Sequence, residues 1–213
     1  MMARIFMLFQ LFNHGSMQST RKSLFYYVFI IFLFYFSITE TRAQSSALSH
    51  TRKKLAVSDY KGVPDENSNF LARTNPVLSY QYSTPVSCGE KGKIRFTFNT
   101  TVSLGSKSWM KVSMIRKPEV LNELLSHEQG HFDISQIFSI DLEKKLSSLC
   151  FDKTRYKTEI DSVFRLMNTY YDSLQKKYDA DTGYMMNRES QTKWKQRISA
   201  MYRKVKEVDY EAK

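Results

Sequence analysis

The period of the apolar positions changes once along this chain, near Pro118. Before that point, residues 77–82 and 93–98 alternate apolar and polar side chains, which is typical of half-buried strands. Residues 108–115 are apolar enough to form a third strand. Residues 54–76 are mostly polar and contain turn formers, so they predict no long element.

From residue 119 onward, apolar residues recur at steps of three and four, which is the spacing of amphipathic helices. The pattern predicts a long first helix, with Pro118 in its first turn and a break near Leu149. A second helix is expected over residues 158–177 and a last one around Trp194, separated by a polar break at residues 178–184. Strands followed by helices indicate an α+β fold, with a small N-terminal β-sheet packed on the long helix.

The N-terminal region has the pattern of a signal peptide. Arg21 and Lys22 precede an uncharged apolar run of about 13 residues, which is short for a membrane span. Small residues around Ala43 offer a cleavage site, so we expect residues 1–43 to be removed and residues 44–213 to form one domain. Met17 is an alternative start of this segment. The protein is then secreted, periplasmic or held in the cell envelope, and only an uncleaved segment would contact the membrane.

Two cysteines and a basic charge add to this picture. Cys88 and Cys150 permit one disulfide in an oxidising compartment, and at this point both its presence and its absence remain open. The formal net charge is +11, but Lys and Arg are spread through the predicted helices. This distribution favours a solvated basic surface and argues against a nucleic-acid partner.

Residues 127–131, His-Glu-Gln-Gly-His, carry the candidate chemistry. On a helix, His127 and His131 lie one turn apart on one face, so both imidazoles can bind one zinc ion. Glu128 is close enough to take a proton from a zinc-coordinated water, whose pKa falls to about 7. The alternative is a pair of histidines that bind nothing.

A catalytic zinc ion normally has three protein ligands and one water. The third ligand is the open question in this sequence. His50 is a poor candidate because it lies in a polar stretch beside the signal segment. Asp179, Asp181 and Tyr184 lie in the polar break and are further candidates. A turn that holds no ligand is an equally good interpretation of that break.

Residues 124–134, Leu-Leu-Ser-His-Glu-Gln-Gly-His-Phe-Asp-Ile, resemble the active-helix signature of the predicted secreted zinc-dependent proteases grouped as domain of unknown function 922. Residues 57–65, Trp109, residues 178–182, Gln191 and Trp194 are similar to other parts of that pattern. The resemblance covers about residues 55–198. It implies a zincin-like fold with zinc as cofactor, a sheet edge beside the active helix, and a peptide or protein as substrate.

The chain departs from the family pattern at one position. Relatives have a His after the segment equivalent to residues 178–182, and it is their expected third ligand, whereas this chain has Tyr184. A phenol with a pKa near 10 must lose its proton to bind zinc well, so it is a poorer ligand than imidazole. Two functions follow. The first is an exported zinc peptidase in which Glu128 is the base and Tyr184 completes the metal shell or donates to the oxyanion. The second is a catalytically degenerate zincin-like binding or scaffold module of the cell envelope.

Overall fold

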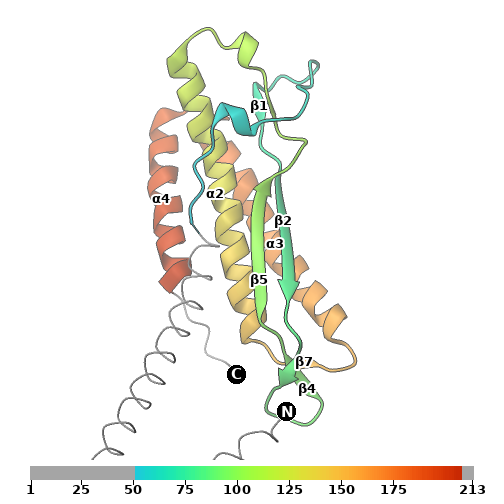
Figure 1. Cartoon of the computed structure of the whole chain (residues 1–213). Coiled ribbons are helices and arrows are strands. Elements are labelled where there is room, and N and C mark those ends of the chain that lie inside the picture. The colour runs from blue at the N-terminus through green and yellow to red at the C-terminus, as the bar shows by residue number, and fades with distance from the viewer. Residues whose placement is uncertain (1–50, 208–213) are drawn as a thin grey trace, which may run out of the picture. The chain divides into compact units, whose positions relative to one another are not determined.

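The computed structural model describes residues 51–207 (Figure 1). The expected signal peptide, residues 1–43, lies outside the described residues, and so does the candidate ligand His50. The described residues fall within one unit of the chain, Ser49–Lys213. Between residues 51 and 207, no helix has both the length and the apolar character needed to cross a membrane.

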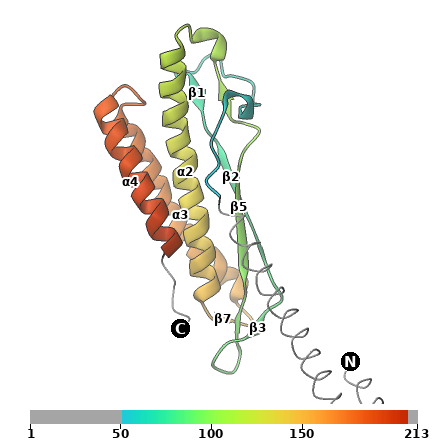
Figure 2. The same cartoon turned by 60° about the vertical axis from the view of Figure 1, so that its left-hand side comes forward.

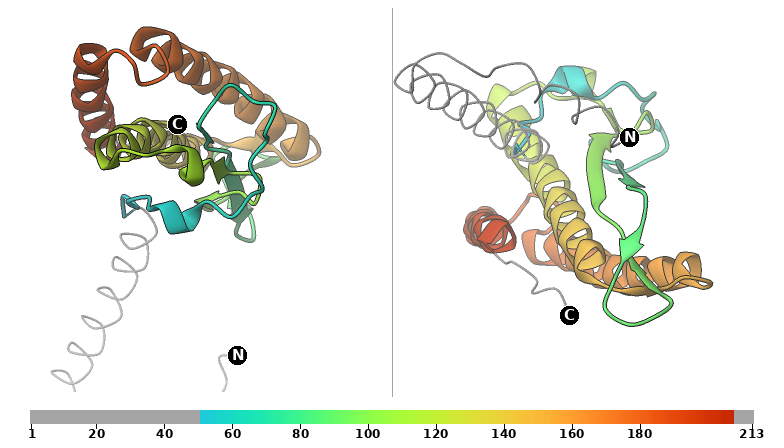
Figure 3. Two further views of the ribbon diagram at one scale, coloured as in Figure 1. Left: turned by 90° about the horizontal axis from the view of Figure 1, so that it is seen from above. Right: turned by 60° about the horizontal axis from the view of Figure 1, so that its bottom comes forward.

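Three long helices dominate the described chain, namely α2 (Pro118–Ser148), α3 (Tyr156–Thr182) and α4 (Arg188–Glu207). α2 begins at Pro118 and ends before Leu149, as the sequence predicts. It lies between the α3 and α4 helices on one side and the long strands on the other (Figure 2). The two further views in Figure 3 show the same order. Because α2 is covered from two sides, it carries buried residues around most of its circumference.

The strands form three small antiparallel sheets instead of the single sheet expected from the sequence. The first pairs β1 (Ala72–Arg73) with β6 (Trp109–Met110), the second pairs β2 (Pro76–Tyr82) with β5 (Phe98–Leu104), and the third contains β3 (Val86–Ser87), β4 (Lys93–Arg95) and β7 (Phe151–Asp152). The β2–β5 ribbon runs along α2 (Figure 1). Small antiparallel sheets packed against three long helices confirm the α+β class.

Two strand predictions were wrong in extent. Residues 93–98 are divided between β4 and β5, because Lys93–Arg95 pair with β3 and β7 whereas the strand that begins at Phe98 pairs with β2. Thr97 instead exchanges hydrogen bonds with the loop after β2. Of residues 108–115, only Trp109–Met110 form a strand, and Val112–Met114 form a short 3₁₀ helix.

The polar break expected at residues 178–184 was also wrong in extent. α3 continues to Thr182 and stops at Gly183, whose left-handed conformation (φ 55°) is a common end for a helix. Tyr178 and Thr182 are fully buried. Tyr178 follows Leu174 and Tyr171 at the helical spacing, so burial of one face keeps this polar sequence helical.

The main core lies where α2 meets α3, α4 and the strands, and aromatic side chains fill much of it. Its fully buried members include Tyr178, Phe151, Ile134, Leu142 and Ile198. Phe96 and Phe98 pack edge to face, with ring centroids 6.1 Å apart, and both contact Phe151. This core attaches the end of α2 to the strands.

Cys88 and Cys150 form a disulfide, which resolves the question left open by the sequence. The bridge joins the residue after β3 to the residue before β7 across 62 positions of the chain. Disulfides persist in oxidising compartments, so this bond is consistent with a location outside the cytoplasm.

Gly130 lies where α3 packs closely against α2. A Cβ atom at this position would lie inside van der Waals contact with the phenol of Tyr178, 2.5 Å from its Cζ atom. Tyr178 is fully buried and cannot move aside without disturbing the core. The glycine inside the His-Glu-Gln-Gly-His motif is therefore a packing requirement of the fold.

We expect Gly130→Ala to lower the free energy of unfolding by about 1–3 kcal/mol, because the added methyl group overpacks the interface. Helix propensity alone predicts the opposite sign, since alanine is favoured over glycine by about 1 kcal/mol. Chemical denaturation measures the difference. Asn122→Ala, at an exposed position of the same helix, is the matched control and should be close to neutral. A Gly130→Ala protein as stable as its parent would contradict the close packing of α2 and α3.

Candidate metal centre

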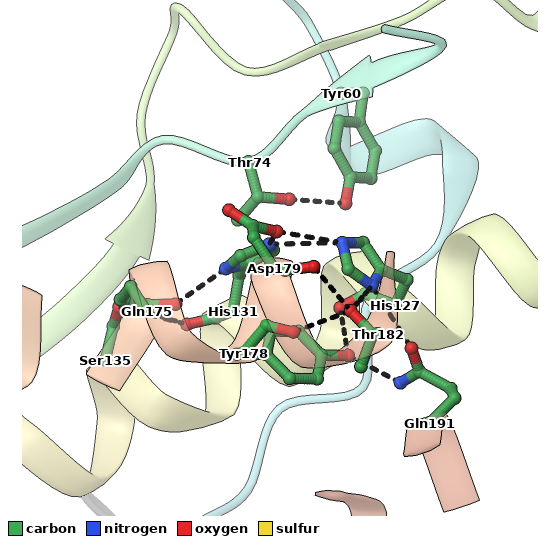
Figure 4. A network of polar contacts seen from close by, with 10 residues as sticks. All are labelled: Tyr60, Thr74, His127, His131, Ser135, Gln175, Tyr178, Asp179, Thr182 and Gln191. Carbon is green, nitrogen blue, oxygen red and sulfur yellow. Dashed lines mark hydrogen bonds and ion pairs between the residues drawn. The ribbon is translucent and has the colours of Figure 1, made fainter. Parts of the chain in front are cut away.

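The two motif histidines present their Nε2 atoms side by side on α2, 3.3 Å apart (Figure 4). This is the expected result of a four-residue separation on a helix. The His127 side chain is 4% exposed and that of His131 is 15% exposed. Both imidazoles are thus largely shielded from solvent and positioned to contact one ion.

Asp179 on α3 completes a group of three. Its Oδ1 atom lies 2.9 Å from Nε2 of His131 and 3.2 Å from Nε2 of His127. The ligand atoms of these three residues all lie within 4.8 Å of one another, so the group could hold a metal ion. Asp179 reaches this position only because α3 continues through residues 178–182.

The charge of this group is set by its internal contacts. Burial alone would raise the pKa of the Asp179 carboxyl, but hydrogen bonds from His127 and His131 hold that pKa well below its usual range. Burial lowers the pKa of His131, but the contact with Asp179 outweighs it and leaves that pKa raised. Asp179 is therefore an anion at neutral pH, as a metal ligand must be.

Gln175 fixes the orientation of His131. Its Nε2 atom donates to the main-chain oxygen of His131 at 2.9 Å and to Oγ of Ser135 at 3.1 Å. Its Oε1 atom is left to face Nδ1 of His131 at 2.6 Å. An amide oxygen only accepts, so Nδ1 of His131 carries a proton, and Nε2, which contacts Asp179, is the atom that would bind a metal ion in place of its own proton.

Gln191 at the start of α4 has the same role for His127. Its Oε1 atom lies 3.1 Å from Nδ1 of His127, and its Nε2 atom donates to the phenol of Tyr178 at 2.5 Å. That phenol donates to the main-chain oxygen of His127 at 2.9 Å, and its ring stacks on the imidazole with centroids 4.8 Å apart. Outer contacts of this kind orient histidine ligands in metal sites.

Glu128 lies in the same region and is 5% exposed. Its Oε2 atom is buried and has no hydrogen-bond partner among the described residues. Such oxygens are uncommon in folded proteins and often mark a place for water or an ion. The orphaned oxygen, together with two imidazoles and a carboxylate, fits a divalent metal with a water molecule beside it.

The other sequence candidates lie away from the imidazoles or on the edge of the site. Asp181 accepts hydrogen bonds from Nε1 of Trp194 at 3.0 Å and from Nζ of Lys177 at 3.1 Å. Tyr184 packs its half-exposed ring against Phe70, with centroids 5.1 Å apart. Asp179 is thus the candidate that the structure brings to the two histidines.

A cleft of about 650 Å³ leads to this centre. His127, Glu128, His131 and Asp179 lie on its wall, opposite the segment around β1 and beside residues 183–186. Tyr60 faces the centre from that opposite side and is hydrogen bonded to Oγ1 of Thr74 at 2.9 Å (Figure 4). Burial raises the pKa of the Tyr60 phenol, so it stays protonated and able to donate.

Sequence reasoning missed the roles of Gln175 and Tyr60, and left Asp179 as one of three alternatives. The sequence does contain a signal for Gln175 and Asp179. Leu174 and Tyr178 continue the helical spacing of apolar residues, and a helix through Tyr178 places Gln175 and Asp179 four residues apart on one face of α3. Tyr60 lies in the family-like segment 57–65, but its role depends on the tertiary fold, which brings it to the centre (Figure 4).

Comparison with known proteins gives one match. The sequence profile described as "Bacterial protein of unknown function (DUF922)" covers residues 46–187, about two thirds of the 213 residues. No curated protein and no solved structure matches the chain. The matched range contains the whole group formed by His127, His131 and Asp179, and its description names no activity. The chain therefore belongs to the DUF922 family of bacterial proteins of unknown function.

Proposed function

We propose that this protein is an exported zinc-dependent peptidase with a zincin-like arrangement of its active helix. One observation carries the proposal: Asp179 meets His127 and His131 beside the unpartnered carboxylate oxygen of Glu128. The disulfide is consistent with an exported protein. The proposed site opens on a cleft that is large enough for part of a peptide.

In this proposal, His127, His131 and Asp179 would hold the zinc ion. Zinc, when bound, polarises a substrate carbonyl and makes water acidic enough to be a nucleophile near neutral pH. Glu128 would accept a proton from the attacking water on its free Oε2 atom and return it to the leaving amine. Gln175 and Gln191 keep the two imidazoles in the tautomer that this requires.

An oxyanion that develops on the substrate carbonyl needs a hydrogen-bond donor. Of the two phenols near the cleft, Tyr60 suits this role better than Tyr184. Thr74 holds the Tyr60 hydroxyl on the side facing the histidines, whereas Tyr184 is half exposed and packs against Phe70 (Figure 4). The metal position first considered for Tyr184 is taken by Asp179 in this proposal.

We further propose that the substrate is an extended peptide or protein segment. β1 lines the cleft and pairs only with β6 among the described strands, so one of its edges carries no strand partner. An extended peptide can add to such an edge through main-chain hydrogen bonds. This placement would bring a peptide bond past Glu128.

A catalytically degenerate binding or scaffold module is the second candidate. It is favoured by Tyr184, which stands where relatives are expected to have a histidine ligand. Metal content separates the two candidates. Less than about a tenth of a zinc ion per chain, even after incubation with zinc, would favour the scaffold.

We expect the purified protein to bind about one zinc ion per chain and Asp179→Asn to weaken the affinity by more than about one hundredfold. The estimate follows because outer-shell partners alone contribute about tenfold to one hundredfold. Competition with a chelating dye measures the affinity, and elemental analysis measures the content. Asp181→Asn is the matched control, since Asp181 lies on the same helix but binds Trp194 and Lys177. Equal affinities for the two variants would remove Asp179 from the centre.

We expect Glu128→Gln to slow peptide hydrolysis by at least about one hundredfold while the zinc content stays unchanged, because the general base is lost but no ligand is. Mass spectrometry of a peptide library measures the cleavage. Glu123→Gln is the control on the same helix, where the carboxylate pairs with Arg188 instead. An unchanged rate for Glu128→Gln would reject its role as the base.

We expect Gln175→Leu to weaken zinc affinity by about tenfold to one hundredfold, because Nδ1 of His131 loses its acceptor. Gln175→Glu keeps an acceptor oxygen and should retain most of the affinity. The pair separates orientation from packing, since both variants lose the donor bonds to His131 and Ser135. Equally weak binding by the two variants would show that the contact does not orient the ligand.

A further inference from the structure

One wall of the metal cleft is apolar and open to solvent. Phe70 and Tyr184 are 50% and 52% exposed and pack ring to ring, with centroids 5.1 Å apart. Met186 is 80% exposed and lines the same cleft. Exposed apolar side chains that line a cleft are typical of a binding surface.

The turn that carries two of these side chains has an uncommon backbone. Gly183, Tyr184 and Met185 follow one another in the left-handed region, with φ of 55°, 51° and 79°. Side chains other than glycine rarely adopt this conformation, and such residues cluster at ligand sites. The strained turn begins at the residue directly after α3, the helix that bears Asp179.

The turn is held at both ends. The N–H group of Tyr184 donates to the main-chain oxygen of Asp179 at 3.2 Å, and that of Asn187 donates to Thr182 at 2.9 Å. Met185 packs against the small core cluster formed by Ala72, Met110 and Leu124. The surrounding contacts therefore impose the conformation, and Tyr184 and Met186 stay directed at the cleft.

We propose that Phe70, Tyr184 and Met186 form a subsite for one large apolar side chain of the substrate, close to the bond that is cut. The inference rests on the peptidase proposal, since it names the substrate class of the same site. An aromatic or branched aliphatic side chain would cover the exposed rings and the thioether. An Asp or Lys side chain would lose hydration there without finding a charged partner among these three residues.

The size of the effect follows from the area that becomes covered. Burying a Leu or Phe side chain stabilises a complex by an amount equivalent to about tenfold to one hundredfold in affinity. Peptides that differ only at this position should therefore be separated by at least about tenfold. Removing Phe70 and Met186 should reduce the separation to less than about threefold.

The test uses the full chain as zinc-loaded Glu128→Gln protein, so that peptides bind without being cut. Fluorescence anisotropy measures the affinity of five labelled peptides that differ at one central position, which is Phe, Leu, Ala, Asp or Lys. Each peptide is measured again with Phe70→Ser and Met186→Ser added. Tyr170→Ser and Met114→Ser are the matched controls, because both residues are exposed but do not line this cleft.

The expected result is tighter binding of the Phe and Leu peptides, lost in the cleft variants and kept in the controls. Equal affinity for all five peptides would overturn the inference, and so would an unchanged preference in the cleft variants or no binding at all. Repeating the series without zinc separates this inference from the peptidase proposal. A preference that persists while the parent protein neither binds zinc nor cuts peptides would support the subsite and overturn the peptidase.

Discussion

The centre depends on one close contact, between Gly130 of α2 and the phenol of Tyr178 on α3. Because position 130 has no side chain, the phenol fits against the helix and donates to the main-chain oxygen of His127. That contact fixes how α3 is rotated about its own axis relative to α2. Asp179 is the next residue, and Gln175 lies four residues before it on the same face, so both are directed at His131. The glycine of the motif thus positions Asp179, a candidate ligand that lies about fifty residues away in sequence.

Two carboxylates lie near the histidines, and their surroundings give them different properties. Asp179 is bound by both imidazoles, and these contacts keep it ionised. Glu128 is buried with one oxygen that has no partner in residues 51–207. In the proposed peptidase, these different surroundings would divide the roles of ligand and base between Asp179 and Glu128. The Nδ1 atoms of the two imidazoles face the neutral amides of Gln191 and Gln175. Asp179 is therefore the anion that contacts the histidines at their Nε2 atoms.

The sequence predicts those parts of the structure that depend on local spacing. The positions of His127 and His131 on a long helix follow from residues a few places apart, and α2 has the expected start and end. The strands are less predictable, because β1, β3, β4, β6 and β7 have only two or three residues each and exist through tertiary pairing. From the sequence, Asp179 is only one of several candidates for the third ligand. The polar residues 178–182 look like a loop, although they form the last turn of α3.

The contacts that support the candidate site extend beyond residue 187, where the match to the family profile ends. α4 begins at Arg188, yet its Gln191 orients His127 and supports the phenol of Tyr178. On the same helix, Trp194 packs edge to face on Tyr178 with centroids 5.4 Å apart. Removing α4 would take away the Gln191 amide that orients His127 and expose the ring that holds α3 in place. The candidate metal centre therefore draws on three helices, of which the matched segment supplies two.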